Sequence, residues 1–188
     1  LFSYCGAVQS FSFKSADVIT FPQNGVLQKY PLVENFNAPN LLNLPANAFA
    51  GCSHLKTYDF SNAITIGARA FENTSISFVN FNKAIEIGEG AFAYNDDLEE
   101  ITLPSATSIS ADMFSVSTCV ESVSFGGITE LPKDFDVSVL FPNITHFSAS
   151  KVNNIPDYYF KDCKRLSSFD FSPINRIIGE GAFENCDI

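Results

Sequence analysis

The chain holds few of the side chains that usually carry chemistry. Among 188 residues there are two histidines, His54 and His146, and five cysteines. No two cysteines form a Cys-x-x-Cys pair, and there is no His-Glu-x-x-His, P-loop or glycine-rich dinucleotide motif. A Ser/His/Asp triad cannot be read from these spacings. We therefore predict no catalytic residue, no metal site and no cofactor.

Acidic residues give the strongest charge signal. The formal net charge is −10, from 21 acidic and 11 basic side chains. Residues 86–136 alone carry eleven acidic side chains against Lys133, so the rest of the chain is balanced. The predicted acidic belt is Asp96, Asp97, Glu99, Glu100 and Glu121. This charge excludes nucleic acid as the main partner, because phosphate neutralisation needs Lys and Arg. It leaves a solvated surface, a basic protein partner, or calcium, although no calcium loop of defined spacing is present.

An internal repeat must position these side chains. The phrase Ile-Gly-x-x-Ala-Phe occurs at 66–71, 87–92 and 178–183. Its last Phe marks a series with intervals of 21 to 25 residues. The landmarks are Phe2, Leu27, Phe49, Phe71, Phe92, Phe114, Phe135, Phe160 and Phe183. Of the 20 Phe, only Phe21, Phe78 and Phe141 lie off the repeat template.

Four further columns of the repeat are apolar in every unit. Two of them are separated by one residue, like Ile101 and Leu103, which is the alternation of a strand. A unit of 21–25 residues is too short to bury its own apolar face, so the units must stack on one another. We predict a β-dominated solenoid of about eight rungs, with one parallel strand per rung and short turns or helical turns on the other face.

These repeats resemble the leucine-rich repeats of the BspA type, written Leu-x-x-Ile-x-Leu-Pro and Ile-Gly-x-x-Ala-Phe-x-x-Cys. Residues 98–104 and the Ile-Gly phrases carry the resemblance, which covers essentially all of the chain. The chain departs by its many Phe, by a long unit between Ile19 and Leu27, and by an insertion at 136–143. The resemblance implies a right-handed leucine-rich-repeat solenoid. It also implies a cell-surface or secreted protein of a host-associated bacterium or parasitic protist, in a family whose members include adhesins.

The outer face of the sheet is the predicted binding surface, because its residues alternate with the buried strand columns. We call it the sheet strip. It consists of Ser10, Ser12, Asn35, Asn37, Thr57, Asp59, Phe78, Asn80, Glu100, Thr102, Ser122, Ser124, His146, Ser148, Ser168 and Asp170. Trp, Tyr and Arg, which dominate protein hot spots, are missing from it. We expect a protein or carbohydrate ligand held by weak, multivalent contacts, or else an inert solvated face.

Four of the five cysteines share one column, three residues after the landmark. The column is Cys5, Tyr30, Cys52, Thr74, Asn95, Ser117, Ser138, Cys163 and Cys186. We expect a buried ladder of small polar groups that bond turn backbone in each rung. A disulfide between Cys163 and Cys186 is a less favoured interpretation, because parallel stacking points both Cβ atoms the same way. Cys119 lies off the column and is the predicted reactive thiol.

Two Asn-x-Ser/Thr sequons begin at Asn73 and Asn143. They predict N-glycosylation if the protein is secreted by a eukaryote. Asn143 ends the insertion, so we expect it to be the more accessible of the two.

No linker interrupts the repeat, so residues 1–188 are predicted to form one solenoid segment. Neither end shows a polar capping unit, and we expect an uncapped part of a longer protein. No apolar run is long enough to span a membrane. The predicted function is a non-catalytic interaction module for adhesion or recognition. The alternative is a structural scaffold that self-assembles into a rod, filament or coat.

Light scattering coupled to size exclusion separates these two functions. For the full-length protein, an interaction module should be a monomer whose mass stays constant over a hundredfold dilution. A self-assembling scaffold should instead show a mass that grows with concentration, and that result would contradict the module.

Overall fold

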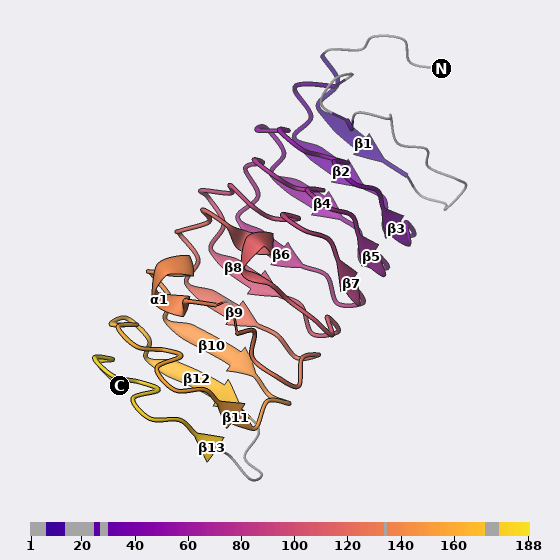
Figure 1. Ribbon diagram of the computed structural model, residues 1–188. Helices are drawn as coiled ribbons and strands as arrows, with labels where there is room; N and C mark the ends of the chain where they lie inside the picture. The colour runs from indigo at the N-terminus through magenta and orange to yellow at the C-terminus, as the bar shows by residue number, and fades with distance from the viewer. Residues whose placement is uncertain (1–6, 14–24, 27–29, 134, 172–176) are drawn as a thin grey trace.

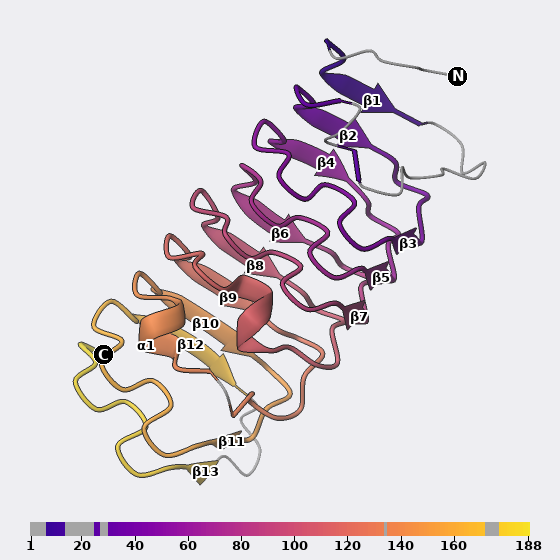
Figure 2. The ribbon, with the colours of Figure 1, turned by 45° about the horizontal axis from the view of Figure 1, so that its top comes forward.

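The computed structural model describes residues 7–13, 25–26, 30–133, 135–171 and 177–188, which form a solenoid of stacked rungs (Figures 1 and 2). Among the described residues, its main face consists of one strand from each of eight rungs, in agreement with the prediction of about eight. These strands are β1 (Ser10–Ser12), β2 (Asn35–Asn37), β4 (Thr57–Asp59), β6 (Phe78–Asn80), β8 (Glu100–Thr102), β9 (Ser122–Ser124), β10 (His146–Ala149) and β12 (Ser168–Phe171). Every pairing is parallel, which confirms the predicted fold. The repeat positions Phe2, Cys5, Ile19 and Leu27 lie outside the described residues.

A second set of short strands was not expected. Its members are β3 (Asn43–Leu44), β5 (Thr65–Ile66), β7 (Glu86–Ile87), β11 (Asn154–Ile155) and β13 (Ile177–Ile178). The glycine after each Ile continues the ladder: Gly67 N–H donates to Leu44 O and Gly88 N–H to Ile66 O, both at 2.8 Å. A Cβ on Gly67 would overlap the backbone of Ala46 in the preceding rung. The Gly of the Ile-Gly phrase is therefore needed for the close approach between rungs as well as for a turn.

Among the described residues, helix is confined to two short pieces, which agrees with the predicted predominance of strands and turns. η1 (Ala111–Phe114) is a 3₁₀ turn, and α1 (Val137–Leu140) is one turn inside the 136–143 insertion. The Asp136 carboxylate caps α1 by accepting a hydrogen bond from the backbone N–H of Val139.

The landmark Phe side chains from Phe49 to Phe114 form a continuous stack in the core. Ring centroids are 5.4 Å apart for Phe49 and Phe71, and 5.8 Å apart for Phe71 and Phe92. Phe92 in turn lies 5.9 Å from Phe114. The next contact of Phe114 is with Phe141, also at 5.9 Å.

Phe141 was therefore wrongly placed off the template. Phe135, the expected landmark, is buried too, and its ring lies 6.1 Å from that of Phe141. The insertion thus adds a second Phe to its rung, and interval counting could not distinguish which of the two would meet Phe114.

A polar ladder lies beside the Phe stack, as expected for most of the cysteine column. Ser138 was wrongly placed in this ladder, because its hydroxyl donates to the Asp136 carboxylate and Phe141 takes the ladder position in its rung. The Asn95 amide nitrogen donates to the carbonyls of Phe71 and Phe92, both at 2.8 Å. Its amide oxygen accepts from the N–H and the hydroxyl of Thr74. The Ser117 hydroxyl bonds the Asn95 N–H and Phe92 O. Buried polar groups are tolerated here because each finds a partner in the neighbouring rung.

The main sheet is interrupted between β4 and β6. Strands β1-β2-β4 form one sheet and β6-β8-β9-β10-β12 the other. At the interruption the Tyr58 hydroxyl donates to Phe78 O at 2.9 Å and accepts the Asn80 N–H at 3.2 Å. Burial raises the pKa of Tyr58, so its hydroxyl keeps the proton that it donates. The Tyr58 hydroxyl therefore forms hydrogen bonds with backbone groups of β6 that would otherwise bond to a neighbouring strand.

Replacing Tyr58 by Phe should lower the free energy of unfolding by roughly 1–3 kcal/mol, because it leaves the Asn80 N–H and Phe78 C=O without their partner. Denaturant unfolding measures this loss. Tyr94→Phe is the matched control, since Tyr94 is half exposed and should change by less than about 0.5 kcal/mol. Equal stability of Tyr58→Phe and wild type would show that the hydroxyl is dispensable at the interruption.

Candidate binding surfaces

The sheet strip has the geometry that the sequence predicts. Its residues fall in two columns on either side of a central column that points into the core. Register pairs Phe78 with Glu100, Val79 with Ile101 and Asn80 with Thr102, and the same alternation continues through β12. The central residues Val79 and Ile101 are fully buried. All sixteen predicted residues thus lie at outward positions of the main sheet.

Many polar side chains of the strip bond one another along the solenoid axis. Asn35 donates to the Ser10 hydroxyl at 3.0 Å and accepts from the Thr57 hydroxyl. At the other end, His146 Nδ1 lies 2.8 Å from Ser168 Oγ. Side chains held in this way present a pre-organised surface, which lowers the entropic cost of binding.

The His146–Ser168 contact does not by itself make a nucleophile and base. Such a pair needs a third group that orients the base. Across the described part of the chain, no hydrogen bond to the other ring nitrogen of His146 is found. Nor do the described residues contain a group of His, Cys, Asp and Glu side chains able to hold a metal ion.

Phe78 is the exception to the small polar character of the strip. It is 38% exposed, and its ring stacks on Tyr58 with centroids 5.6 Å apart. The aromatic residue that interrupts the sheet thus supports the exposed ring beside it. Sequence reasoning singled out Phe78 but missed Tyr58, because Tyr58 occupies an ordinary inward position of the repeat.

The acidic belt lies on adjacent rungs, as expected. The N–H of Glu121 donates to Glu99 O at 2.8 Å, so their side chains start from neighbouring positions. Arg165 relieves part of the repulsion, since its guanidinium lies 3.7 Å from the Glu121 carboxylate. Asp96, Asp97 and the other members of the belt are exposed to solvent.

The two sequons differ in solvent accessibility, in the opposite order to the one expected. Asn73 is exposed, whereas Asn143 is half buried. The Asn143 amide donates to Thr118 O at 3.0 Å and accepts from Arg165 at 2.8 Å. The insertion places Asn143 against its neighbouring rungs, so its position at a loop end did not predict accessibility.

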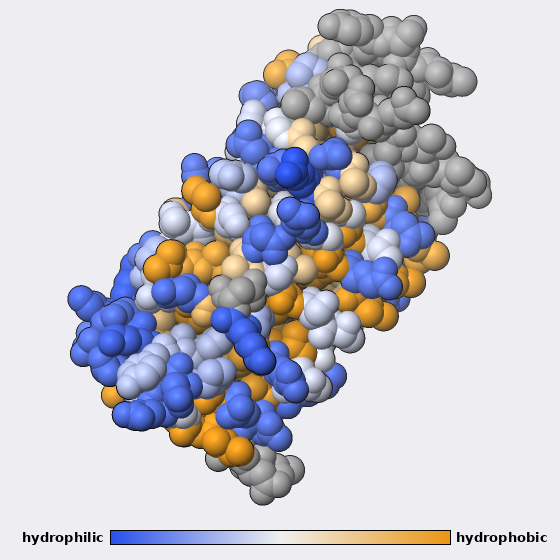
Figure 3. Space-filling model, viewed as in Figure 1, coloured by the Kyte–Doolittle hydropathy of each residue, from blue (hydrophilic) through white to orange (hydrophobic). Residues whose placement is uncertain are grey.

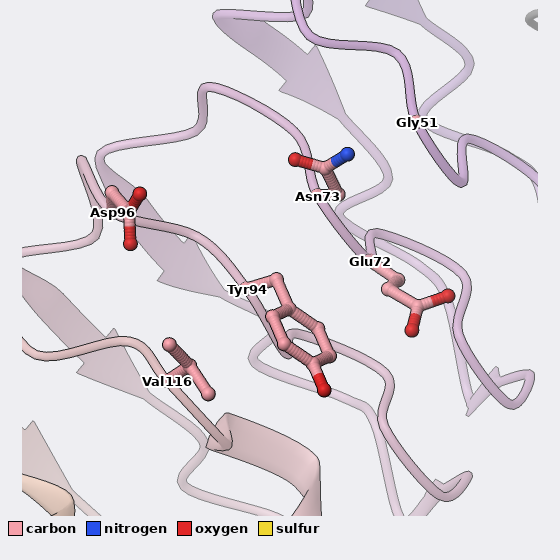
Figure 4. A pocket seen from close by; sticks show the side chains of 6 residues that line it. All are labelled: Gly51, Glu72, Asn73, Tyr94, Asp96 and Val116. Carbon is pink, nitrogen blue, oxygen red and sulfur yellow. The ribbon is translucent and has the colours of Figure 1, made fainter.

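The turn face carries a groove that sequence reasoning missed. It is lined by Gly51, Glu72, Asn73, Tyr94, Asp96 and Val116 and has a volume of about 470 Å³ (Figure 4). Gly51, Asn73, Tyr94 and Val116 occupy one column, two residues after each landmark Phe. The signal available in the sequence was the change in this column from Gly and Asn to Tyr and Val.

The cysteine column contains no disulfide among its described members. Cys163 and Cys186 are free thiols, and Cys186 donates to Phe160 O at 2.9 Å. Burial raises the pKa of Cys163 to about 12 and also raises that of Cys186. Cys119, by contrast, is exposed.

Alkylation of the native protein at pH 8 should therefore modify Cys119 first and leave Cys163 protected. Only the thiolate reacts, and a thiol with a pKa of about 12 is ionised in about one molecule in ten thousand at this pH. Raising the pH to 9 should not open Cys163, since the pH is still far below its pKa. Peptide mapping by mass spectrometry after iodoacetamide treatment measures each site. Labelling of Cys163 at the rate of Cys119 in the folded protein would contradict its burial.

No helix among the described residues is long and apolar enough to cross a membrane. No curated relative matches the chain. Three solved structures are similar to it at low sequence identity. A leucine rich cell surface protein from Faecalibacterium prausnitzii A2-165 is 14% identical over 74% of this chain and 60% of its own, with a TM-score of 0.33. A leucine-rich repeat protein from Eubacterium ventriosum ATCC 27560 is 12% identical over 84% of both chains, with a TM-score of 0.40.

A leucine-rich repeat protein from Bacteroides ovatus ATCC 8483 is 16% identical over 95% of this chain and 68% of its own, with a TM-score of 0.33. The present chain thus spans about 60% of the length of the first of these proteins. The sequence itself matches the family described as BspA type leucine rich repeat region (6 copies), over residues 1–98, 23–135 and 85–188. Together these matches cover the whole chain, which belongs to the BspA type leucine-rich repeat family.

Proposed function

We propose that this chain is a non-catalytic interaction module of a cell-surface or secreted protein, and that the sheet strip binds its ligand. The family supports a repeat module for interaction or stacking. A surface location is supported by the family and by the description of the F. prausnitzii protein as a cell surface protein. The observation that carries the proposal is Phe78, an exposed ring that stacks on Tyr58 within a strip of hydrogen-bonding side chains.

The ligand class that best fits this arrangement is a carbohydrate. A sugar offers an apolar face to an aromatic ring and hydroxyl groups to the side chains around it. Phe78 supplies the ring, and Glu100 is its register partner on β8 along the solenoid axis. Asn80 adds an exposed amide from the same strand. Few and precisely placed polar groups around an apolar contact are typical of small-molecule sites.

A glycan array probed with the purified chain tests this function, followed by titration of the best glycan. Phe78→Ala should weaken that binding at least tenfold, or about 1.4 kcal/mol. Val139→Ala is the control, because Val139 is 72% exposed on α1, away from the strip, and should leave affinity unchanged. Thermal unfolding of each variant shows whether the fold is intact. Unchanged affinity in both Phe78→Ala and Asn80→Ala would place the glycan elsewhere.

A basic protein is the second candidate ligand, favoured by the acidic belt. Glu99 and Glu121 start from adjacent rungs, and of the two only Glu121 has an ion-pair partner among the described residues. If the array finds no glycan, replacing Glu99, Glu100 and Glu121 with Lys should weaken binding to a captured protein and reduce its dependence on salt. Binding and salt dependence that survive this triple change would exclude the belt as the interface.

A further inference from the structure

The groove on the turn face contains no residue of the sheet strip and shares only Asp96 with the acidic belt. In Figure 4, Tyr94 and Val116 project from consecutive rungs, with the Glu72 carboxylate on one side of Tyr94 and Asp96 on the other. Tyr94 is 50% exposed and Val116 is 53% exposed. On the face shown in Figure 3, hydrophilic and hydrophobic residues are interspersed. An exposed aromatic ring in a groove that two carboxylates line needs an explanation of its own.

Tyr94 and Val116 lie in the column two residues after the landmark Phe, where the backbone conformation is unfavourable for their residue types. Tyr94 has φ of 58° and Val116 of 61°, in the left-handed region. The equivalent positions of other rungs use residues that tolerate this conformation, including Gly51, Asn73 and Asn185. A β-branched residue such as Val is an outlier there. About half of each side chain is exposed, so core packing does not offset the backbone strain. A binding role for the two side chains would explain why these residues occur there.

The charges around the groove specify what it can bind. Glu72 and Asp96 both line it, and within the described ranges neither forms an ion pair. Arg69 is the basic residue nearest to Glu72 in sequence, and its side chain lies against Gly90, in the column two residues before the landmark. Two unpaired carboxylates beside an aromatic face attract an ammonium or guanidinium group by charge and by the ring quadrupole.

We propose that this groove binds a lysine or arginine side chain of a partner protein. Tyr94 supplies the ring face, Glu72 and Asp96 supply the opposite charge, and Val116 contacts the aliphatic stem of the bound side chain. The groove of about 470 Å³ is large enough for one such side chain and open enough to accept it from a protein surface. The module therefore has two independent contact faces.

A fluorescent nonapeptide of alternating Lys and Ser is the probe, with a peptide of norleucine and Ser as its uncharged counterpart. Anisotropy titration at low salt should show binding of the lysine peptide and none of the norleucine peptide. Glu72→Gln, Asp96→Asn and Tyr94→Asn should each weaken binding at least fivefold. The charge-matched control is Glu86→Gln, which removes one exposed acid outside both the groove and the belt and should change affinity less than twofold. Phe78→Ala should leave it unchanged, which separates this site from the sheet strip.

Thermal unfolding supplies the second measurement. Tyr94→Asn and Val116→Asn should keep or raise the melting temperature while weakening binding, because Asn suits a left-handed backbone. Tyr158→Asn is the matched control: Tyr158 also has a positive φ of 56°, but it lies outside the groove. It should not affect peptide binding. Absence of lysine-peptide binding, or an equal loss in Glu86→Gln and Asp96→Asn, would overturn the proposal.

Discussion

Each rung of this solenoid needs the rungs beside it to bury its landmark Phe. Phe92 illustrates the constraint, with its ring between those of Phe71 and Phe114 at 5.8 and 5.9 Å. A rung of 21–25 residues has no core of its own, so stability is shared between neighbours. The polar ladder obeys the same constraint, because Asn95 satisfies the carbonyl of Phe71 in the rung before it. The position of a residue within the rung therefore restricts which side chains the fold accepts there.

Departures from the repeat become informative under this constraint. Tyr58 interrupts the main sheet, yet its hydroxyl satisfies the backbone groups of β6 that it exposes. The insertion around α1 brings Phe141 into the core, and that ring takes the contact with Phe114. Both departures are compensated within the fold. Tyr94 and Val116 are not compensated in this way, since they combine a left-handed backbone with half-exposed side chains.

Sequence periodicity predicted the fold, the sixteen strip positions and most of the polar ladder, because one apolar column every 21–25 residues determines the register of all the others. It could not predict where that regularity fails. Tyr58 and Val79 occupy the same column, and only the geometry between strands shows that the Tyr58 hydroxyl replaces a strand pairing. Likewise, the backbone angle of Val116 is not visible in its residue type, which is ordinarily a strand former.

The two proposed contact faces differ in how their side chains are held. On the sheet strip the side chains bond one another across rungs, as Asn35 does with Ser10 and Thr57, and the backbone beneath them is paired. On the turn face the backbone itself holds Tyr94 in place, at a conformational cost. A regular strip repeated over many rungs suits avidity, since any rung can take a weak contact. A single groove suits a point contact, since no other described rung places an aromatic ring in the Gly51–Asn73 column. The solenoid can thus combine a diffuse recognition surface with one local anchor, because stacking fixes both faces in the same register.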